Sequence, residues 1–408
     1  MKICIVGGGL TGLSAALSLG RDHEVELYER CRNLGGCISS YEVGDTHIES
    51  FYHHCFAGDT RLLSLMDMLG IRGRLEWLRG STGYFVDGRI HPLDTPQEIL
   101  RYPHLSLSDK ARLALLTLRS KRMDTSSLDG MTARDFIIGK LGERAYSSFF
   151  EPLLASKFGE FRDQVSAAWL VSRIAIRSNR GLSGERLGYL DGGFFTLVDA
   201  LSDRVGRDCV IRLGDAVTSI ARETWGWRVN GQKYDAVIST IPPQALPAGT
   251  IQGLDPVPYQ GAACMLLGLE RDVAEGIYWL NMKDPAPYGA VIAHTNFVPR
   301  DRYPEHLVYL ASYFHGKPPA NHDERMLSDF CERFGVARKE VHWHRMAVEP
   351  CAGPLYTTGF ARKIVPYRTG GLYLAGMFSR PNYPERSMDG AVAAGTEVAD
   401  LVLKDSGA

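Results

Sequence analysis

Several features that would mark a specialised protein are scarce or missing in this chain of 408 residues. No apolar run reaches the roughly 18 residues that a membrane-spanning helix needs, so the sequence predicts no transmembrane segment. Met1 and Lys2 lead directly into a short apolar run and glycines, without the pattern of a secretory signal peptide. The 46 basic and 47 acidic residues nearly cancel, which argues against a protein whose main partner is nucleic acid.

Cysteine and histidine are present, but they are not grouped. The eight cysteines are scattered, and none forms a C-x-x-C pair or has the spacing of a zinc site. The 12 histidines include no H-E-x-x-H and no set spaced with cysteines or carboxylates for a metal. We therefore expect free thiols in a reducing cytoplasm, and no metal centre.

Glycine is abundant instead, and the first thirty residues show where it matters. Lys2–Val6 has the apolar, β-branched composition of a strand that is buried on both faces. Leu13–Leu19 is a compact helical stretch, and Glu24–Glu29 alternates as a second strand. This βαβ pattern predicts an α/β protein with a Rossmann-like unit at its start.

The turn between the first strand and the helix has the spacing G-x-G-x-x-G. The first glycine permits the tight turn, the second lets backbone approach a pyrophosphate, and the third lets the helix pack on the sheet. The start of the helix presents free N–H groups to the phosphates, and an acid at the end of the second strand can bind a ribose. The dinucleotide-binding residues expected from this motif are Gly7, Gly9, Leu10, Thr11, Gly12 and Glu29.

The remaining chain divides into further units. At about 150 residues per domain, the length predicts two or three domains. Thr82–Ile90 reads as a hairpin with Asp87-Gly88 in a two-residue turn, and most of 97–180 reads as helices. We expect a discontinuous Rossmann-like domain (1–72, 195–255 and 355–408), a mixed-sheet substrate domain (73–96 and 256–354) and a helical subdomain (97–194).

Two further motifs extend the glycine signature. Glu29-Arg30 is followed after four residues by Gly35-Gly36, and Gly371–Gly376 precedes Asp389-Gly390-Ala391 near the end of the chain. Together they resemble the FAD-dependent amine-oxidase superfamily, which includes protoporphyrinogen oxidases, phytoene desaturases and, more distantly, UDP-galactopyranose mutases. The resemblance implies FAD as cofactor. It also implies contacts from Arg30, Gly35, Gly36, Cys37, Val217, Gly376, Met377, Ser387 and Met388.

The sequence departs from the superfamily at two of these positions. Cys37 stands where many relatives carry an arginine that contacts phosphate, and Met377 stands where many carry an aspartate. Arg30 or Arg32 would then supply the missing positive charge, and backbone N–H groups would replace the aspartate. No cysteine lies in the C-terminal motif, so the resemblance implies a flavin that is not covalently attached.

Catalytic candidates come from two segments. Glu49–Phe56 matches the family segment beside the flavin ring, so Tyr52, His53 and His54 could orient substrate or take a proton, unless the histidines are core and surface residues. In the loop at 378–387, Arg380 and Tyr383 could bind substrate, unless the loop is only held by local ion pairs. We expect His53, His54, Arg380 and Tyr383 to converge on one cavity.

These residues favour an FAD-dependent oxidoreductase that removes a hydride from a C–H or N–H bond of a small organic substrate, as an oxidase, dehydrogenase or desaturase. The alternatives are a redox-neutral flavoenzyme acting on a nucleotide sugar, like UDP-galactopyranose mutase, and an FAD-binding protein without catalysis. The basic, leucine-rich helix near 108–123 is either an ordinary surface helix or a contact with the membrane surface. We accordingly expect a cytoplasmic protein that is either free or peripheral to a membrane.

Overall fold

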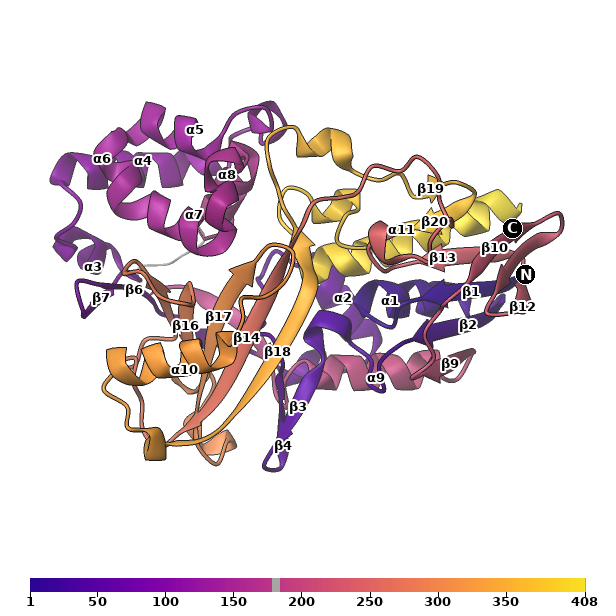
Figure 1. The fold of residues 1–408 in the computed structure, drawn as a ribbon, viewed down its shortest axis with the longest axis horizontal. Helices are drawn as coiled ribbons and strands as arrows, with labels where there is room; N and C mark the ends of the chain where they lie inside the picture. Colours follow the sequence, from indigo (N-terminus) through magenta and orange to yellow (C-terminus); the bar gives the residue numbers. More distant parts are fainter. Residues whose placement is uncertain (178–183, 408) are drawn as a thin grey trace.

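The glycine motif belongs to a six-stranded sheet close to both chain ends, as the computed structural model of residues 1–177 and 184–407 shows (Figure 1). Five of the strands are parallel, which brings their carboxyl ends to one edge, where such sheets bind ligands. The strand order is β19 (Arg368–Thr369), β20 (Leu372–Leu374), β13 (Ala236–Ser239), β1 (Lys2–Val6), β2 (Glu24–Glu29) and β9 (Cys209–Leu213).

Alternate side chains of the central strand β1 enter two different layers. Ile3 and Ile5 pack among helices, whereas Cys4 and Val6 pack against a small antiparallel sheet on the other face. Strand β1 is therefore buried on both sides, as its apolar run predicted. The helices are α1 (Leu10–Leu19), α2 (Thr60–Met68), α9 (Phe195–Val205) and α11 (Met388–Ser406), and the small sheet is β10 (Ile220–Glu223), β11 (Gly226–Val229) and β12 (Gln232–Tyr234).

A second, seven-stranded mixed sheet forms the neighbouring unit. Helix α10 (His322–Arg333) covers one face, and the opposite face carries small side chains such as Ala262, Ala290 and Ala311 toward the interior of the molecule. The predicted hairpin at 82–90 is present, with Asp87 and Gly88 at positive φ in its turn. The order is β18 (Val341–Pro354), β14 (Tyr259–Leu269), β17 (His306–Phe314), β16 (Ala290–Ala293), β15 (Trp279–Met282), β6 (Thr82–Val86) and β7 (Arg89–Pro92).

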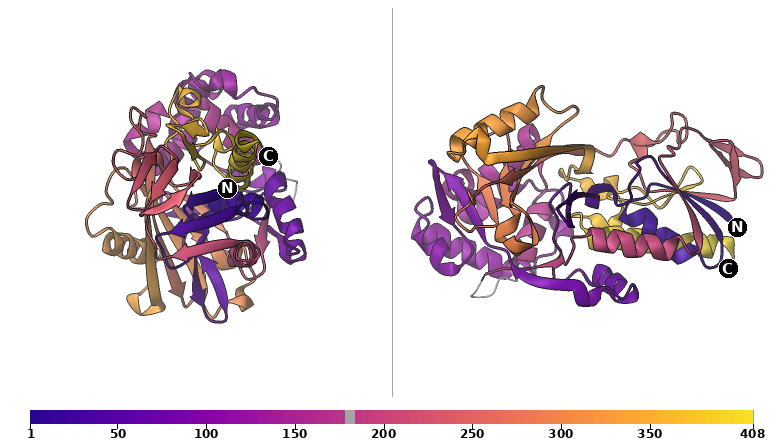
Figure 2. Two further views of the ribbon diagram at one scale, coloured as in Figure 1. Left: turned by 90° about the vertical axis from the view of Figure 1, so that its right-hand side faces the viewer. Right: turned by 90° about the horizontal axis from the view of Figure 1, so that it is seen from below.

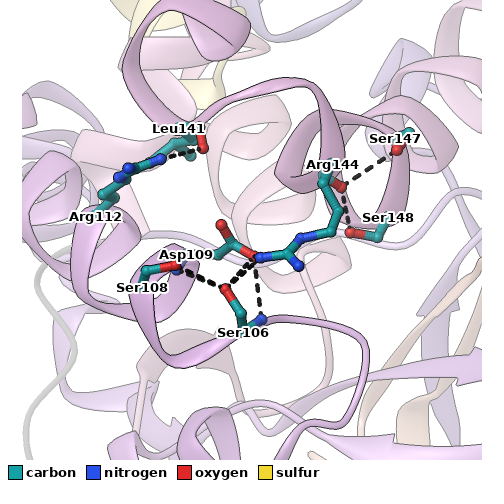
Figure 3. Close-up of polar contacts among 8 residues, drawn as sticks. All are labelled: Ser106, Ser108, Asp109, Arg112, Leu141, Arg144, Ser147 and Ser148. Carbon is teal, nitrogen blue, oxygen red and sulfur yellow. Dashed lines mark hydrogen bonds and ion pairs between the residues drawn. The ribbon is translucent and has the colours of Figure 1, made fainter.

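A helical unit lies beside the second sheet, and both are at the end of the molecule opposite the chain termini (Figures 1 and 2). Arg144 fastens it by donating to Ser106 Oγ at 2.5 Å and to Asp109 at 2.8 Å, while Arg112 donates to the Leu141 carbonyl at 3.2 Å (Figure 3). The helices are α3 (Pro96–Arg101), α4 (Leu107–Ser120), α5 (Ala133–Leu141), α6 (Glu143–Ala145), a π-helical turn (Tyr146–Phe150), α7 (Glu151–Phe158) and α8 (Ala167–Arg177).

The α/β fold class is confirmed, but two details of the prediction were wrong. Arg186–Leu190, expected in the helical block, forms strand β8, which pairs with β5 (Leu75–Arg79) and buries Tyr189. The pattern at 217–222 also predicts a strand, but β10 begins only at Ile220, so Val217 lies before it, outside helices and strands. Residues 178–183 of the predicted helical block lie outside the described residues. Among the described residues, no helix is long and apolar enough to cross a membrane.

Candidate active site

The glycine turn after β1 leaves open space in front of its backbone. Gly7 has φ +107°, which L side chains rarely adopt, and a Cβ at Gly12 would lie 2.0 Å from the Gly7 carbonyl oxygen. A Cβ at Gly9 would meet nothing within 4 Å. Gly9 therefore faces a cavity, whereas Gly12 lets helix α1 pack on the turn, and this division matches the roles expected of a dinucleotide site.

The second glycine pair lies beside the first. The N–H of Gly35 donates to the Gly8 carbonyl at 2.9 Å, and Gly35 and Gly36 both have positive φ. This contact joins the loop after β2 to the turn after β1. The two glycine motifs thus form one continuous wall of backbone.

Glu29 holds this wall in place from the end of β2. Its two carboxylate oxygens accept hydrogen bonds from the N–H groups of Gly8 at 2.7 Å and Cys31 at 2.8 Å. Each oxygen keeps a further lone pair, and the side chain lines the cavity. Glu29 can therefore still accept hydrogen bonds from ribose hydroxyl groups.

Two helix N-termini point positive dipole ends toward the same space. Helix α1 begins at Leu10 in the cavity wall, and α11 begins there too, capped by Ser387, whose hydroxyl accepts from the Gly390 N–H at 2.9 Å. Such termini favour negatively charged groups. The residues expected at the cofactor that line the cavity are Gly7, Gly9, Leu10, Thr11, Glu29, Arg30, Gly35, Gly36, Cys37, Val217, Gly376, Met377, Ser387 and Met388.

The two glycine motifs and the two helix N-termini together form a cradle for the cofactor. The cavity extends well beyond this cradle. It has a volume of about 1740 Å³ and runs from the glycine turns, between the two sheets, into the helical unit. Pockets for a single drug-sized ligand have volumes of about 300–1,000 Å³. The space is therefore large enough for a dinucleotide and a second molecule beside it.

His53 lines the cavity as a neutral imidazole. Burial lowers its pKa to about 4, and its Nδ1 lies 2.7 Å from the carbonyl oxygen of Phe51. Because a carbonyl only accepts, Nδ1 must carry the proton, which leaves Nε2 with a lone pair. His53 is thus set to accept a hydrogen bond at Nε2.

Tyr52 and His54 complete this wall with Trp279. The hydroxyl groups of Tyr52 and Tyr313 are hydrogen-bonded at 2.6 Å, and the Tyr52 ring meets Trp279 edge-on with centroids 4.9 Å apart. His54 Nδ1 lies 3.2 Å from the hydroxyl of Tyr278. The segment Glu49–Phe56, which the sequence predicts beside the flavin ring, therefore lines the cavity through Tyr52 and through both histidines.

The prediction that Arg380 and Tyr383 join the histidines in one cavity was wrong. Tyr383 donates to Asp129 at 2.5 Å, and Arg380 is exposed above the Tyr383 ring. The reason is buried Asn382, which donates to the Gly376 carbonyl and accepts from the Ser387 N–H, and so fixes the direction of the loop. Neither Arg380 nor Tyr383 lines the cavity.

The same loop instead sends Glu385 and Arg386 into the cavity, where they meet two further cations. Lys157 of α7 and Arg173 of α8 each lie 3.8 Å from Glu385 Oε1. Burial alone would raise the pKa of Glu385, but Lys157, Arg173 and Arg386 hold it below its usual range. We define Lys157, Arg173 and Arg386 as the cationic cluster. Sequence reasoning missed it, and its only local signal is the Glu385-Arg386 pair before α11.

A Rossmann-type turn, a second glycine pair and a C-terminal helix at one cavity define an FAD-binding protein of the amine-oxidase fold. Residues 10–403 match the model of the family described as flavin containing amine oxidoreductase, so the chain belongs to this family. FAD is accordingly its cofactor, and the glycine cradle fits it. The family expected from the sequence is thus confirmed.

Individual relatives are distant. The chain is 25% identical to coproporphyrinogen III oxidase of Mycobacterium tuberculosis (strain ATCC 25618 / H37Rv) over 284 residues, which are 62% of this chain and 61% of that protein. It shares its fold with a candidate protoporphyrinogen oxidase from Exiguobacterium sp. 255-15 (TM-score 0.77, 21% identity, 99% of both chains). The same holds for reduced UDP-galactopyranose mutase (TM-score 0.75, 19% identity, 99% of this chain and 95% of that chain).

Proposed function

We propose that the protein is an FAD-dependent oxidoreductase that removes a hydride from a C–H or N–H bond of an organic substrate. The observation that carries this proposal is the single cavity that joins the glycine cradle to the wall of Tyr52, His53 and Trp279. FAD, when bound, accepts the hydride, and the substrate releases a proton. The protein contributes the position of the substrate and the path of that proton.

In this proposal, His53 orients the substrate. Its Nε2 accepts a hydrogen bond from the N–H or polarised C–H group next to the bond that breaks, and its Nδ1 stays with Phe51. An imidazole with a pKa of about 4 is a weak base at neutral pH, so it passes the proton on rather than keeping it. The aromatic rings of Tyr52 and Trp279 support the substrate beside it.

The outer part of the cavity favours a substrate with a large apolar body. Side chains from four helices of the helical unit line it, including Ile99, Leu113, Leu153 and Ile174. Apolar walls of this kind bind apolar surface and keep water away from the reacting bond. The name of the mycobacterial relative makes coproporphyrinogen III the first substrate to test.

The mouth of this chamber also favours a membrane surface as a partner. Leu107 and Leu118 of α4 are 75% and 76% exposed, and both also line the cavity. Exposed Arg119 and Arg122 follow Leu118 closely in the chain, so apolar and basic side chains are exposed together at the end of α4. We propose that this surface contacts anionic lipid, from which an apolar substrate would enter.

The central test is a spectrum of the purified protein under anaerobic conditions. We expect bound FAD whose visible absorbance is bleached by coproporphyrinogen III or by another organic reductant with a large apolar body. An oxidised flavin that stays unbleached with every reductant would contradict the oxidoreductase assignment.

A second candidate, a redox-neutral reaction on a nucleotide sugar, is favoured by the cationic cluster. It predicts turnover of UDP-sugars only after reduction with dithionite.

A further inference from the structure

We infer that the cationic cluster is an anion-binding site for the substrate, which is therefore an amphipathic organic anion with a carboxylate or phosphate group. This inference rests on the proposed function, because it concerns the molecule bound beside FAD. Lys157, Arg173 and Arg386 come from α7, α8 and the loop before α11. They meet only because the helical unit packs against the C-terminal loop.

The cluster gathers positive charge at one wall of the cavity. Three cations surround one carboxylate, that of Glu385, whose side chain is 9% exposed. The Cys37 thiol and the hydroxyl groups of Tyr313 and Tyr356 also act on Arg386, and they are neutral near pH 7 because burial raises the pKa of each above its usual value. Three partly buried cations at one cavity wall attract an anion and can donate charge-assisted hydrogen bonds to it, so the site favours a carboxylate or phosphate group.

The wall of the cavity is shaped around Arg386. A Cβ at Gly353 of β18 would lie 2.2 Å from Arg386 Nε, so a glycine is what lets the guanidinium group lie there. Lys157 is held from the other side, with Nζ 4.7 Å from the Trp169 ring centroid. A guanidinium in a fixed position can donate two parallel hydrogen bonds to a carboxylate or phosphate.

The surroundings specify the rest of the ligand. Leu153 lies one turn before Lys157 on α7, Ile174 is next to Arg173 on α8, and both line the cavity. On the inner side, Arg386 acts electrostatically on His53 and Cys37, which places the cluster between the apolar chamber and the cofactor cradle. A bound ligand would hold its anionic group at the cluster and its apolar body along α7 and α8.

Binding can be measured on the oxidised holoenzyme without any turnover. Decanoate, decyl phosphate and 1-decanol, each below its micelle concentration, are titrated while changes in the visible spectrum of the flavin are followed. We expect both anions to bind at least about tenfold more tightly than the alcohol, because only the anions can accept charge-assisted hydrogen bonds from the cluster. Tighter binding of decanoate would identify a carboxylate substrate, and tighter binding of decyl phosphate would identify a phosphate.

Variants then locate the site. Arg173→Met and Lys157→Met should each weaken decanoate binding about tenfold and leave 1-decanol unchanged. Arg134→Met removes an arginine that is 44% exposed and pairs with Glu143 outside the cavity, so it serves as the matched control. Equal affinities for the alcohol and the anions, or unchanged anion binding in both cluster variants, would overturn the inference.

This design separates the inference from the proposed function. If either cluster variant loses its fold or its FAD, the comparison of anion and alcohol on the wild-type protein still decides. Failure of every reductant to bleach the flavin would remove the oxidoreductase assignment but would not change these affinities. The converse result is that an uncharged reductant bleaches the flavin while the anions bind no more tightly than the alcohol. That result would support the oxidoreductase activity and contradict the anion-binding site.

Discussion

The carboxylate of Glu29 accepts a hydrogen bond at 2.7 Å from the backbone N–H of Gly8, 21 residues earlier in the chain. The acid at the end of β2 therefore shapes the glycine turn as well as facing the cavity. Glu29→Ala should lower FAD affinity and also destabilise the apoprotein by about 1.5–3 kcal/mol, because Gly8 and Cys31 lose a charged acceptor. Apoprotein melting and FAD titration measure the two effects separately. Unchanged apoprotein stability would show that the turn does not depend on Glu29.

Gly9 and Gly12 should differ when each is replaced by valine. A Cβ at Gly9 meets open space, so Gly9→Val should fold normally and lose FAD affinity on the order of 100-fold, as phosphate contacts are blocked. A Cβ at Gly12 would lie 2.0 Å from the Gly7 oxygen, so Gly12→Val should lower the stability of the apoprotein itself. Circular dichroism and FAD content distinguish them. If Gly9→Val is yellow and contains a full complement of FAD, the phosphates of FAD do not bind at this glycine turn.

His53 should matter for substrate and not for the cofactor. His53→Ala should slow anaerobic reduction of the flavin by substrate about 10²-fold or more, since oriented proton-transfer groups contribute about 10²–10⁴-fold, while FAD stays bound. Stopped-flow absorbance measures the rate. The reduction rate of His54→Ala is measured in the same way, so that the contributions of the two neighbouring histidines can be compared. A wild-type reduction rate in the double variant would remove both histidines from the mechanism.

Glu49 provides a pH-dependent prediction about stability. The side chain is fully buried, and burial raises its pKa to about 7 although Phe194 N–H and Tyr189 donate to it. The folded protein keeps this proton where the unfolded chain loses it, so the free energy of unfolding should fall as pH rises from about 4.5 to 7. Glu49→Gln should remove that loss, which amounts to roughly 3 kcal/mol at pH 8. Denaturant titrations at pH 5 and pH 8 test this, and equal pH dependence in both proteins would contradict it.

Tyr383 should behave as a structural residue. Tyr383→Phe removes the hydrogen bond to Asp129 and should cost about 1 kcal/mol or somewhat more of stability. Flavin reduction by substrate should remain at the wild-type rate, and Arg380→Ala should also leave it unchanged. A tenfold slower reduction of the flavin in either variant would show that the replaced residue takes part in the reaction.

The cofactor half of the site could be predicted from the sequence because its parts are close in the chain and need special backbone. Gly7, Gly9 and Gly12 act through local geometry, and Glu29 ends the next strand of the same unit. The cationic cluster could not be predicted in this way. Lys157 and Arg173 read as ordinary polar positions of helices, and only the packing of α7 and α8 on the loop turns them inward.

The direction of the side chains in the loop before α11 also could not be predicted from the sequence. Arg380 and Arg386 are six residues apart and chemically identical, and no local pattern indicates that the second one enters the cavity. Buried Asn382, tied to Gly376 and Ser387, decides which arginine enters the cavity. Strand β8 was missed for a similar reason, since it exists through pairing with β5, more than a hundred residues earlier.

The six-stranded sheet also sets the order in which the molecule can be completed during synthesis. Strand β1 pairs with β13, from the middle of the chain, and β13 pairs in turn with β20, near its end. Helix α11, whose N-terminus lines the cofactor cavity, follows all of these strands in the chain. A nascent chain still attached to the ribosome therefore carries the glycine turn long before it has a closed cradle. Binding of FAD in a closed cradle therefore requires that α11 has been synthesised and has packed on the sheet.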